Sequence, residues 1–175
     1  TLSNTFQATR AKLDDVRTDT DGQVRTAIDR VNILSEHIAN LNGEILGADA
    51  IGSDSSSLRD QRTVLITEIA ELTGAKQTVN TDGTVNLTIG EGRAIVSGDR
   101  AFTLNAVSTP PLGFAQITLN GEPANFDEGR IRGYQDAIAE TNSNIDTLDG
   151  LASALVGRVN TLMQTGPLRP RMKSR

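Results

Sequence analysis

Residues 24–45, VRTAIDRVNILSEHIANLNGEI, decide the fold that this sequence can adopt. Apolar residues recur in this stretch at alternating intervals of three and four, which places them on one stripe along a helix. The stripe consists of Val24, Ala27, Val31, Leu34, Ile38, Leu41 and Ile45. Similar spacing continues upstream to Leu2, so we expect one helix over residues 3–46, roughly 60 Å long at 1.5 Å per residue.

A second stripe with the same spacing lies near the C-terminus. It consists of Tyr134, Ile138, Thr141, Ile145, Leu148, Ala152, Leu155, Val159 and Leu162. A helix as long as the first needs a partner along its side, so we expect the two stripes to pair as antiparallel helices of one chain. Leu34 and Leu41 would then face Leu148 and Leu155. Gly22 interrupts the first helix at a cost of about 1 kcal/mol relative to Ala, and we expect a bend or a weak point there.

The sequence between the two stripes changes its period twice. A loop rich in Gly, Ser and Asp over residues 47–57 offers Asp54 or Ser55 as an N-cap. A shorter amphipathic helix over residues 58–73 follows, and Gly74 ends it. Alternating polar and apolar residues then predict strands, with Gly and Pro at the turns, over residues 84–89, 94–96, 101–104 and 114–119.

This order of elements predicts an α+β fold that is mostly helical. We expect a long antiparallel helical coiled coil with a short third helix and an inserted small antiparallel β region. Residues 1–74 and 131–166 would form the helical domain, and residues 75–130 the β-rich insertion. Residues 167–175 are basic and broken by proline, so we interpret them as an engineered remnant or a truncation point and expect disorder.

The composition argues against several classes of function. A net charge of -5 provides no basic surface for phosphates, and 3% aromatic residues with no Trp provide no platform for stacking bases or sugars. The absence of Cys excludes disulfides and thiolate chemistry, and a single His argues against a structural zinc site. No apolar run approaches the ~20 residues that cross a bilayer, and we expect no signal peptide.

No catalytic, cofactor-binding or metal-binding constellation is legible, so we expect neither enzymatic activity nor a cofactor. His37 lies beside the first stripe, where a half-exposed packing role is the better interpretation. Gly90-Glu91-Gly92 lacks the third glycine and the following helix of a phosphate-binding loop, and indicates a hairpin turn. The carboxylates within residues 14–21 fit a solvated helix face better than a cation site, and Asp21 and Arg25 form a favourable i,i+4 pair.

Two motifs stand out, Leu-Arg-Asp-Gln-Arg at residues 58–62 and Asp-Gly-Thr-Val-Asn at residues 82–86. They resemble motifs of the flagellar hook-associated protein 1 family, the hook–filament junction proteins. The family carries a Leu-x-Asp-Gln-Arg-Asp box at the start of a short helix and a later strand with Asp-Gly-Thr-Val-Asn. This chain has, in the same order, Asp60, Gln61 and Arg62, then Asp82, Gly83, Thr84, Val85 and Asn86. It departs from the box at Thr63, where the family usually has Asp. Residues 38–42, 96–98, 129–134 and 159–160 resemble further family segments, so the likeness extends to about Gly166.

The resemblance implies a structural component of the bacterial flagellum. Such a protein joins hook to filament as a ring of its own copies, beside the hook protein and a neighbouring hook-associated protein. It lies outside the cell after flagellar export. We expect this chain to be a core fragment without the family's terminal inner-tube helices and outer variable domains. The alternative is a coiled-coil partner-binding module of a phage tail or a signalling protein.

Two further expectations concern surfaces. Asp60 and Arg62 lie near the start of the short helix, where they either hold the loop above it or decorate a solvated first turn. A closed helical seam with a polar outer face leaves no large apolar patch. We therefore expect a monomer that binds neither nucleic acid nor membrane.

Overall fold

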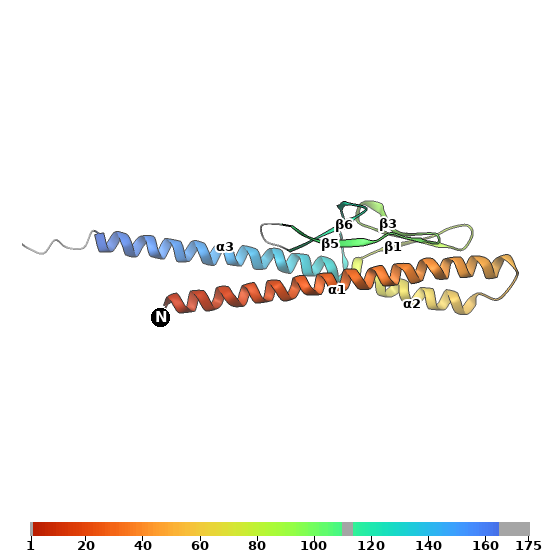
Figure 1. Ribbon diagram of the computed structural model, residues 1–175, viewed down its shortest axis with the longest axis horizontal. Coiled ribbons are helices and arrows are strands. Elements are labelled where there is room, and N and C mark those ends of the chain that lie inside the picture. Colours follow the sequence, from red (N-terminus) through yellow and green to blue (C-terminus); the bar gives the residue numbers. More distant parts are fainter. Residues whose placement is uncertain (1, 110–113, 165–175) are drawn as a thin grey trace, which may run out of the picture.

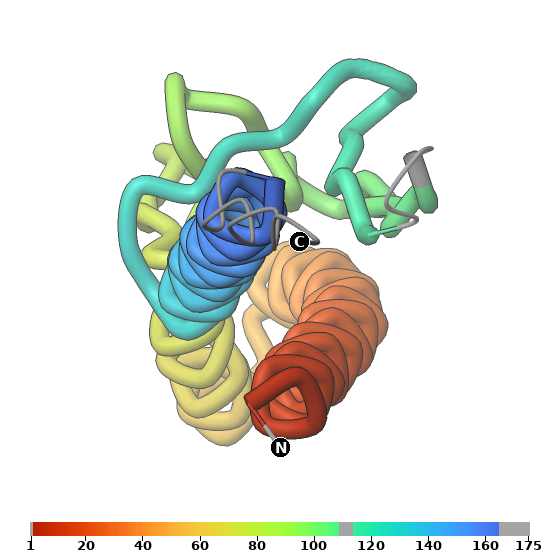
Figure 2. Tube along the Cα trace, turned by 90° about the vertical axis from the view of Figure 1, so that its left-hand side faces the viewer, coloured from red at the N-terminus to blue at the C-terminus, as the bar shows by residue number. Residues whose placement is uncertain are grey.

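The computed structural model describes residues 2–109 and 114–164, and the predicted tail lies outside this part of the chain. The fold is α+β and mostly helical, an elongated rod of helices with strands along one side (Figure 1, Figure 2). Helix α1 spans Leu2–Ala50, α2 spans Ser56–Thr73 and α3 spans Gly129–Gln164. Within the described residues, no helix combines the length and apolar character needed to cross a membrane.

Helix α1 is a single helix of 49 residues. It continues without interruption through Gly22, where an added Cβ would meet nothing within 4 Å. It also runs past the predicted end at residue 46 and through Gly47, because the glycine is exposed and costs only about 1 kcal/mol there. The loop to α2 is correspondingly shorter than the predicted residues 47–57.

Helices α2 and α3 pack against different halves of α1, and both run antiparallel to it (Figure 1). Arg30 of α1 forms a two-pronged ion pair with Glu68 of α2, with N–O distances of 2.7 and 2.8 Å. Arg17 of α1 donates to Asn142 of α3 at 2.8 Å. Helix α2 therefore covers the C-terminal half of α1, and α3 covers the N-terminal half.

Helices α1 and α3 pack against each other antiparallel, as predicted, but the predicted facing of Leu34 and Leu41 with Leu148 and Leu155 is wrong, because α3 begins midway along α1. The β-rich insertion leaves the helices at Gly74 and returns at Gly129, and the two glycines touch. A Cβ on Gly129 would lie 2.6 Å from the backbone nitrogen of Gly74. Since α3 starts where α2 ends, it can only run toward the N-terminus of α1. The first stripe therefore packs against α2, the sheets and the first turns of α3, where Ile131, Tyr134 and Ile138 join the same core.

The two stripes also differ in burial. In the first stripe Leu41 is half-buried, and the buried members are Val24, Ala27, Val31, Leu34, Ile38 and Ile45. In the second, Ile145 is buried and Ile138 and Leu148 are half-buried, but Leu155, Val159 and Leu162 are 40%, 46% and 70% exposed. Helix α3 extends past the first described residue of α1 (Figure 1). The seam is therefore not closed at this end, and the expected absence of an apolar patch is wrong there.

The insertion folds into two small antiparallel sheets. The first has the order β1 (Lys76–Val79), β2 (Val85–Ile89), β3 (Arg93–Ser97) and β4 (Arg100–Ala101). The second has the order β5 (Leu104–Thr109), β6 (Phe114–Leu119) and β7 (Glu122–Pro123). A 3₁₀ turn at Gly90–Gly92 joins β2 to β3, as the hairpin interpretation predicts.

The predicted strand over residues 101–104 is wrong, because the chain changes sheets there. Phe102 still donates its backbone N–H to Ile95 of the first sheet at 2.9 Å. Leu104 instead pairs with Leu119 of β6 and begins the second sheet. The local alternation of apolar and polar residues is the same on both sides of the change, so it could not reveal the break.

The core lies between the sheets and the helices. Every second residue of β2 is buried, namely Val85, Leu87 and Ile89. A register shift between Leu87 and Thr88 lets two consecutive residues of β3 be buried, Ile95 and Val96. Burying such a side chain contributes about 1.5–3 kcal/mol. Apolar packing thus holds the sheets on the rod.

Candidate functional site

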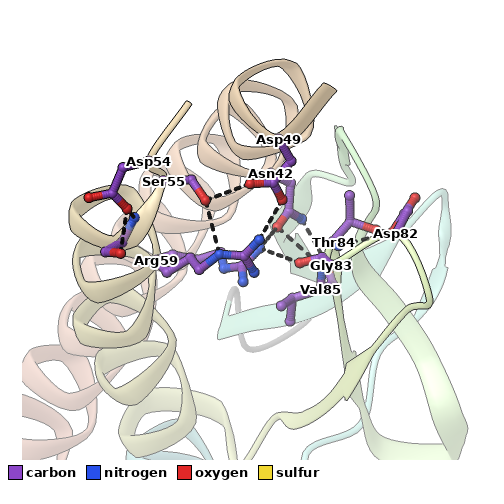
Figure 3. A network of polar contacts seen from close by, with 11 residues as sticks. Asn42, Asp49, Asp54, Ser55, Arg59, Asp82, Gly83, Thr84 and Val85 are labelled. Carbon is purple, nitrogen blue, oxygen red and sulfur yellow. Dashed lines mark hydrogen bonds and ion pairs between the residues drawn. The ribbon is translucent and has the colours of Figure 1, made fainter. Parts of the chain in front are cut away.

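A buried polar network around Asn42 joins α1, α2 and the first sheet (Figure 3). Asn42 Oδ1 accepts from Arg62 Nη1 at 2.7 Å and from the backbone N–H of Val85 at 3.1 Å. Its Nδ2 donates to the carbonyls of Val85 at 2.8 Å and Gly98 at 2.6 Å. The side-chain amide, which is 0% exposed, uses all four of its hydrogen-bonding positions. One residue of α1 therefore fixes a helix and two chain segments of the sheet.

Arg62 supplies the contact from α2. It is 6% exposed, and its Nη1 donates to the Gly83 carbonyl at 3.0 Å as well as to Asn42. Burial, and to a smaller extent the charge of Arg59, lower the pKa of the Arg62 guanidinium below its usual value. Arginine suits this position because it keeps its charge when desolvated and offers donors in a rigid plane.

A second arginine, Arg59, closes the connection between α1 and α2 (Figure 3). Its Nε donates to Ser55 Oγ at 3.1 Å, and its Nη2 pairs with Asp49. Ser55 Oγ in turn donates to Asp49 Oδ1 at 2.7 Å. Ser55 stands at the N-cap, as predicted, but without a side-chain cap bond. Asp54 Oδ1 instead accepts from the hydroxyl of Ser56 and from its backbone N–H, and these bonds lower the pKa of Asp54.

The turn before β2 positions the Gly83 carbonyl and the Val85 N–H that bond Arg62 and Asn42. Asp82 Oδ1 accepts from the N–H of Thr84 at 2.9 Å and from its Oγ1 at 2.6 Å, which lowers the pKa of the Asp82 carboxyl. Gly83 adopts a φ of 81°, a left-handed conformation that favours glycine. Asn86 Oδ1 accepts from the N–H of Gly98 at 2.8 Å, which ties β2 to the turn after β3.

The eight motif residues therefore fall into three groups. Arg62, Gly83 and Val85 meet in the network, and Asp82, Thr84 and Asn86 shape the backbone beside it. Asp60 and Gln61 lie on the exposed face of α2. Because Arg62 turns inward to Asn42 and Gly83 while Asp60 is exposed, the pair does not hold the loop between α1 and α2. Arg59 holds it instead, through Ser55 and Asp49.

Two more side chains of α1 fasten the second sheet, and the sequence reasoning did not identify them. Asn32 donates to the Leu104 carbonyl and accepts from the Leu104 N–H, both at 2.8 Å. Asp21 accepts from the Ala115 N–H at 2.6 Å and from Arg25 Nε at 2.8 Å. Arg25 also donates to the Ala106 carbonyl of β5 at 3.2 Å.

Asp21 corrects the expectation that this carboxylate belongs to a solvated face, because it is only 9% exposed. Asp21, Asn32 and Asn42 follow one another at intervals of 11 and 10 residues. Three helical turns take about 10.8 residues, so the three side chains lie on one side of α1. In the sequence, these residues could have been recognised as polar residues that recur every three turns on the same side of α1 as the apolar stripe. We call Asp21, Asn32 and Asn42 the anchor residues.

Other candidate sites offer little chemistry. His37 is exposed and lines a groove of about 560 Å³ between α1 and α2 with Leu41, Val64 and Leu65. Across residues 2–109 and 114–164, no three His, Cys, Asp or Glu side chains gather closely enough to hold a metal ion. The anchor residues and their partners remain the most developed polar arrangement of the rod.

An elongated helical rod with sheets fastened along one side by buried polar contacts defines a structural module. A family model for the "Flagellar hook-associated protein FlgK helical domain" matches residues 1–168. The chain therefore belongs to this family of flagellar structural proteins, which places it in the bacterial flagellum.

Individual relatives agree with this assignment. "Flagellar hook-associated protein 1" of Escherichia coli (strain K12) is 32% identical over 130 residues, covering 72% of this chain and 24% of the relative. The protein of the same name from Salmonella typhimurium is 32% identical over 108 residues, covering 61% and 20%. This chain thus spans about a quarter of the length of its curated relatives.

A solved structure shows the same fold. "The structure of the flagellar hook junction protein FlgK from Burkholderia pseudomallei" superposes with a TM-score of 0.67 at 19% sequence identity. The match covers 78% of this chain and 26% of that one. Membership of the family favours a flagellar protein over a phage-tail or signalling module, the alternative that the residues alone left open.

Proposed function

We propose that this chain is the helical part of a protein that joins the flagellar hook to the filament and has no catalytic activity. Membership of the hook-associated family carries this proposal. Its partners would be the hook protein, a neighbouring hook-associated protein and further copies of itself in a ring. Its place would be outside the cell, after export by the flagellar secretion system.

The shape of the molecule supports a mechanical role. Helix α1 has 49 residues, which corresponds to about 73 Å at 1.5 Å per residue. The tandem helices α2 and α3 brace it from the side, and the anchor residues hold the sheets at set positions along it. We interpret residues 1–74 with 131–166 as the rod and residues 75–130 as a surface unit carried by it. The apolar stripes and the motif residues would then serve the stability of this frame.

Deletion of the gene in the source bacterium tests the proposal. Cells that lack a hook–filament joint should assemble hooks without filaments and release filament subunits into the medium. Re-expression of the full-length protein should restore filaments. Electron microscopy of the cell surface together with a blot of the culture medium would show both effects. Normal filaments on deletion cells would contradict the proposal.

The role of the network can be tested in the same cells. Asn42→Ala removes the central amide, whereas Asn40→Ala changes an exposed asparagine two residues away on the same helix. We expect the Asn42 variant to lose filaments as the growth temperature rises, and the Asn40 variant to behave as the unchanged protein. Equal behaviour of the two variants would mean that the network does not serve assembly.

A further inference from the structure

The dipeptide Asn-Gly occurs twice in this chain, at Asn42-Gly43 and at Asn120-Gly121. The two copies lie in opposite environments. Asn42 is buried within α1, and its side-chain amide makes four hydrogen bonds. Asn120 is exposed in the two-residue turn between β6 and β7.

The turn at Asn120 is tight and open to solvent. Asn120 has a φ of 55° and Gly121 a φ of 84°, so both residues are left-handed. This is the pattern of a type I′ hairpin turn, in which Asn-Gly is the favoured pair. An added Cβ on Gly121 would meet nothing within 4 Å, so no other segment of the chain packs against this side of the turn.

We propose that Asn120 is a site of spontaneous deamidation. The backbone nitrogen of Gly121 attacks Cγ of Asn120, so an N–Cγ bond forms and the Cγ–Nδ2 bond breaks. Ammonia leaves with the proton from the Gly121 nitrogen, and a five-membered succinimide remains. Water then opens this ring at either carbonyl, which gives aspartate or isoaspartate. Glycine permits the attack because it has no side chain that obstructs the ring.

The product would loosen the last strand of the second sheet. Arg93 of β3 binds the backbone of this hairpin on both sides of the turn. Its Nη2 donates to the Leu119 carbonyl at 2.6 Å, and its Nη1 donates to the carbonyls of Glu122 and Pro123. Isoaspartate inserts one more carbon into the backbone of the turn. The longer turn would change the distance between the Leu119 carbonyl before it and the Glu122 and Pro123 carbonyls after it, so Arg93 could no longer bond all three. The reaction also adds a carboxylate close to Glu122.

Peptide mapping of the whole folded chain tests the proposal with an internal control. Trypsin places Asn120 in peptide 101–130 and Asn42 in peptide 31–59. After incubation at mildly alkaline pH, mass spectrometry with fragmentation locates the exchange of NH₂ for OH at each asparagine. A parallel incubation in denaturant gives the rate of each site in the unfolded chain.

In the folded chain we expect Asn120 to react within about tenfold of its unfolded rate, and faster at higher pH. Asn42 should be slowed by at least about a thousandfold, because it reacts only in rare unfolded molecules. Asn120→Gln should abolish the signal in peptide 101–130 in the folded chain, since glutamine would have to close a larger ring. Protection of Asn120 equal to that of Asn42 would overturn the proposal, as would reaction at Asn105 or Asn125 instead.

Discussion

Replacement of Asn42 by alanine should destabilise the fold more than any single apolar truncation at the rim of the core. The substitution removes an acceptor from the buried Val85 N–H and from Arg62, and removes a donor from the carbonyls of Val85 and Gly98. A buried donor left without a partner costs about 1–3 kcal/mol. Arg62 keeps its bond to Gly83, so its loss is smaller. We expect a total of about 3–5 kcal/mol, a large share of a typical stability of 5–15 kcal/mol.

Asn42→Asp separates hydrogen bonding from charge. The aspartate would keep both acceptor bonds of Oδ1 and gain attraction to Arg62. It would also place a carboxylate oxygen against the carbonyls of Val85 and Gly98, which asparagine reaches at 2.8 and 2.6 Å with its NH₂ group. We expect a destabilised protein, because buried lone pairs then face each other without a proton between them. An aspartate variant as stable as the unchanged chain would show that the ion pair with Arg62 matters more than the amide donors.

Urea unfolding followed by far-UV circular dichroism measures these changes. Asn40→Ala is the control, since this asparagine is exposed and its loss should change the free energy of unfolding by less than about 0.5 kcal/mol. A double-mutant cycle of Asn42→Ala with Arg62→Met should give a coupling of about 1–3 kcal/mol. If Asn42→Ala lowered the free energy of unfolding by less than about 1 kcal/mol, with an unchanged slope against urea concentration, the Asn42 hydrogen bonds would not have the importance for stability assigned to them here.

Three more substitutions test other parts of the frame by the same urea titration. Ser35→Ala should stabilise by about 1 kcal/mol, because the Ser35 hydroxyl is buried with no hydrogen-bond partner among the described residues. Gly22→Ala should add about 0.5–1 kcal/mol, since the site is helical and open. Gly129→Ala should cost about 3 kcal/mol or more, because its φ is 89° and its Cβ would strike the Gly74 backbone. The pKa of the Asp82 carboxyl is lower in the folded chain than its unfolded value of about 4. The ionised carboxylate therefore stabilises the fold fully above its unfolded pKa, and this stabilisation is lost as the pH falls through the lower folded pKa. In Asp82→Asn the free energy of unfolding should depend less on pH in this acid range.

The sequence predicts the elements of this fold well because each element has a local signal. The apolar stripe from Val24 to Ile45 marks α1, the left-handed Gly74 ends α2, and strict alternation marks β2. A stripe shows that a face is buried but not which element buries it. The partner of α1 therefore changes from α2 to α3 at a point that only the contact between Gly74 and Gly129 determines. That contact joins residues 55 positions apart, and no local pattern encodes it.

The candidate site was harder to predict, because its central residues look like interruptions of the apolar pattern. Asn42 and Asn32 are polar residues on a buried arc, and on their own they would be costly to bury. Their cost is offset by groups far away in the sequence, among them the backbone of Val85 and Leu104, 43 and 72 residues on. The motif residue Arg62 could be found by resemblance to the family. The spacing of Asp21, Asn32 and Asn42 marks Asn42 as a polar residue on the buried side of α1, but only the structure shows which groups it bonds.

The anchor residues give a physical reason for combining polar and apolar contacts along the rod. Apolar contacts supply most of the stabilisation, but they are not directional, so a sheet held by them alone could shift along α1 at little cost. An asparagine that bonds both the N–H and the carbonyl of one strand residue allows a single alignment. The nearest comparable case is a buried asparagine that sets the register of a coiled coil. Asn42 fixes the first sheet in this way, and Asn32 and Asp21 fix the second at two points, on β5 and β6. The anchor residues, spaced three helical turns apart on α1, thus determine where each sheet lies along the helix.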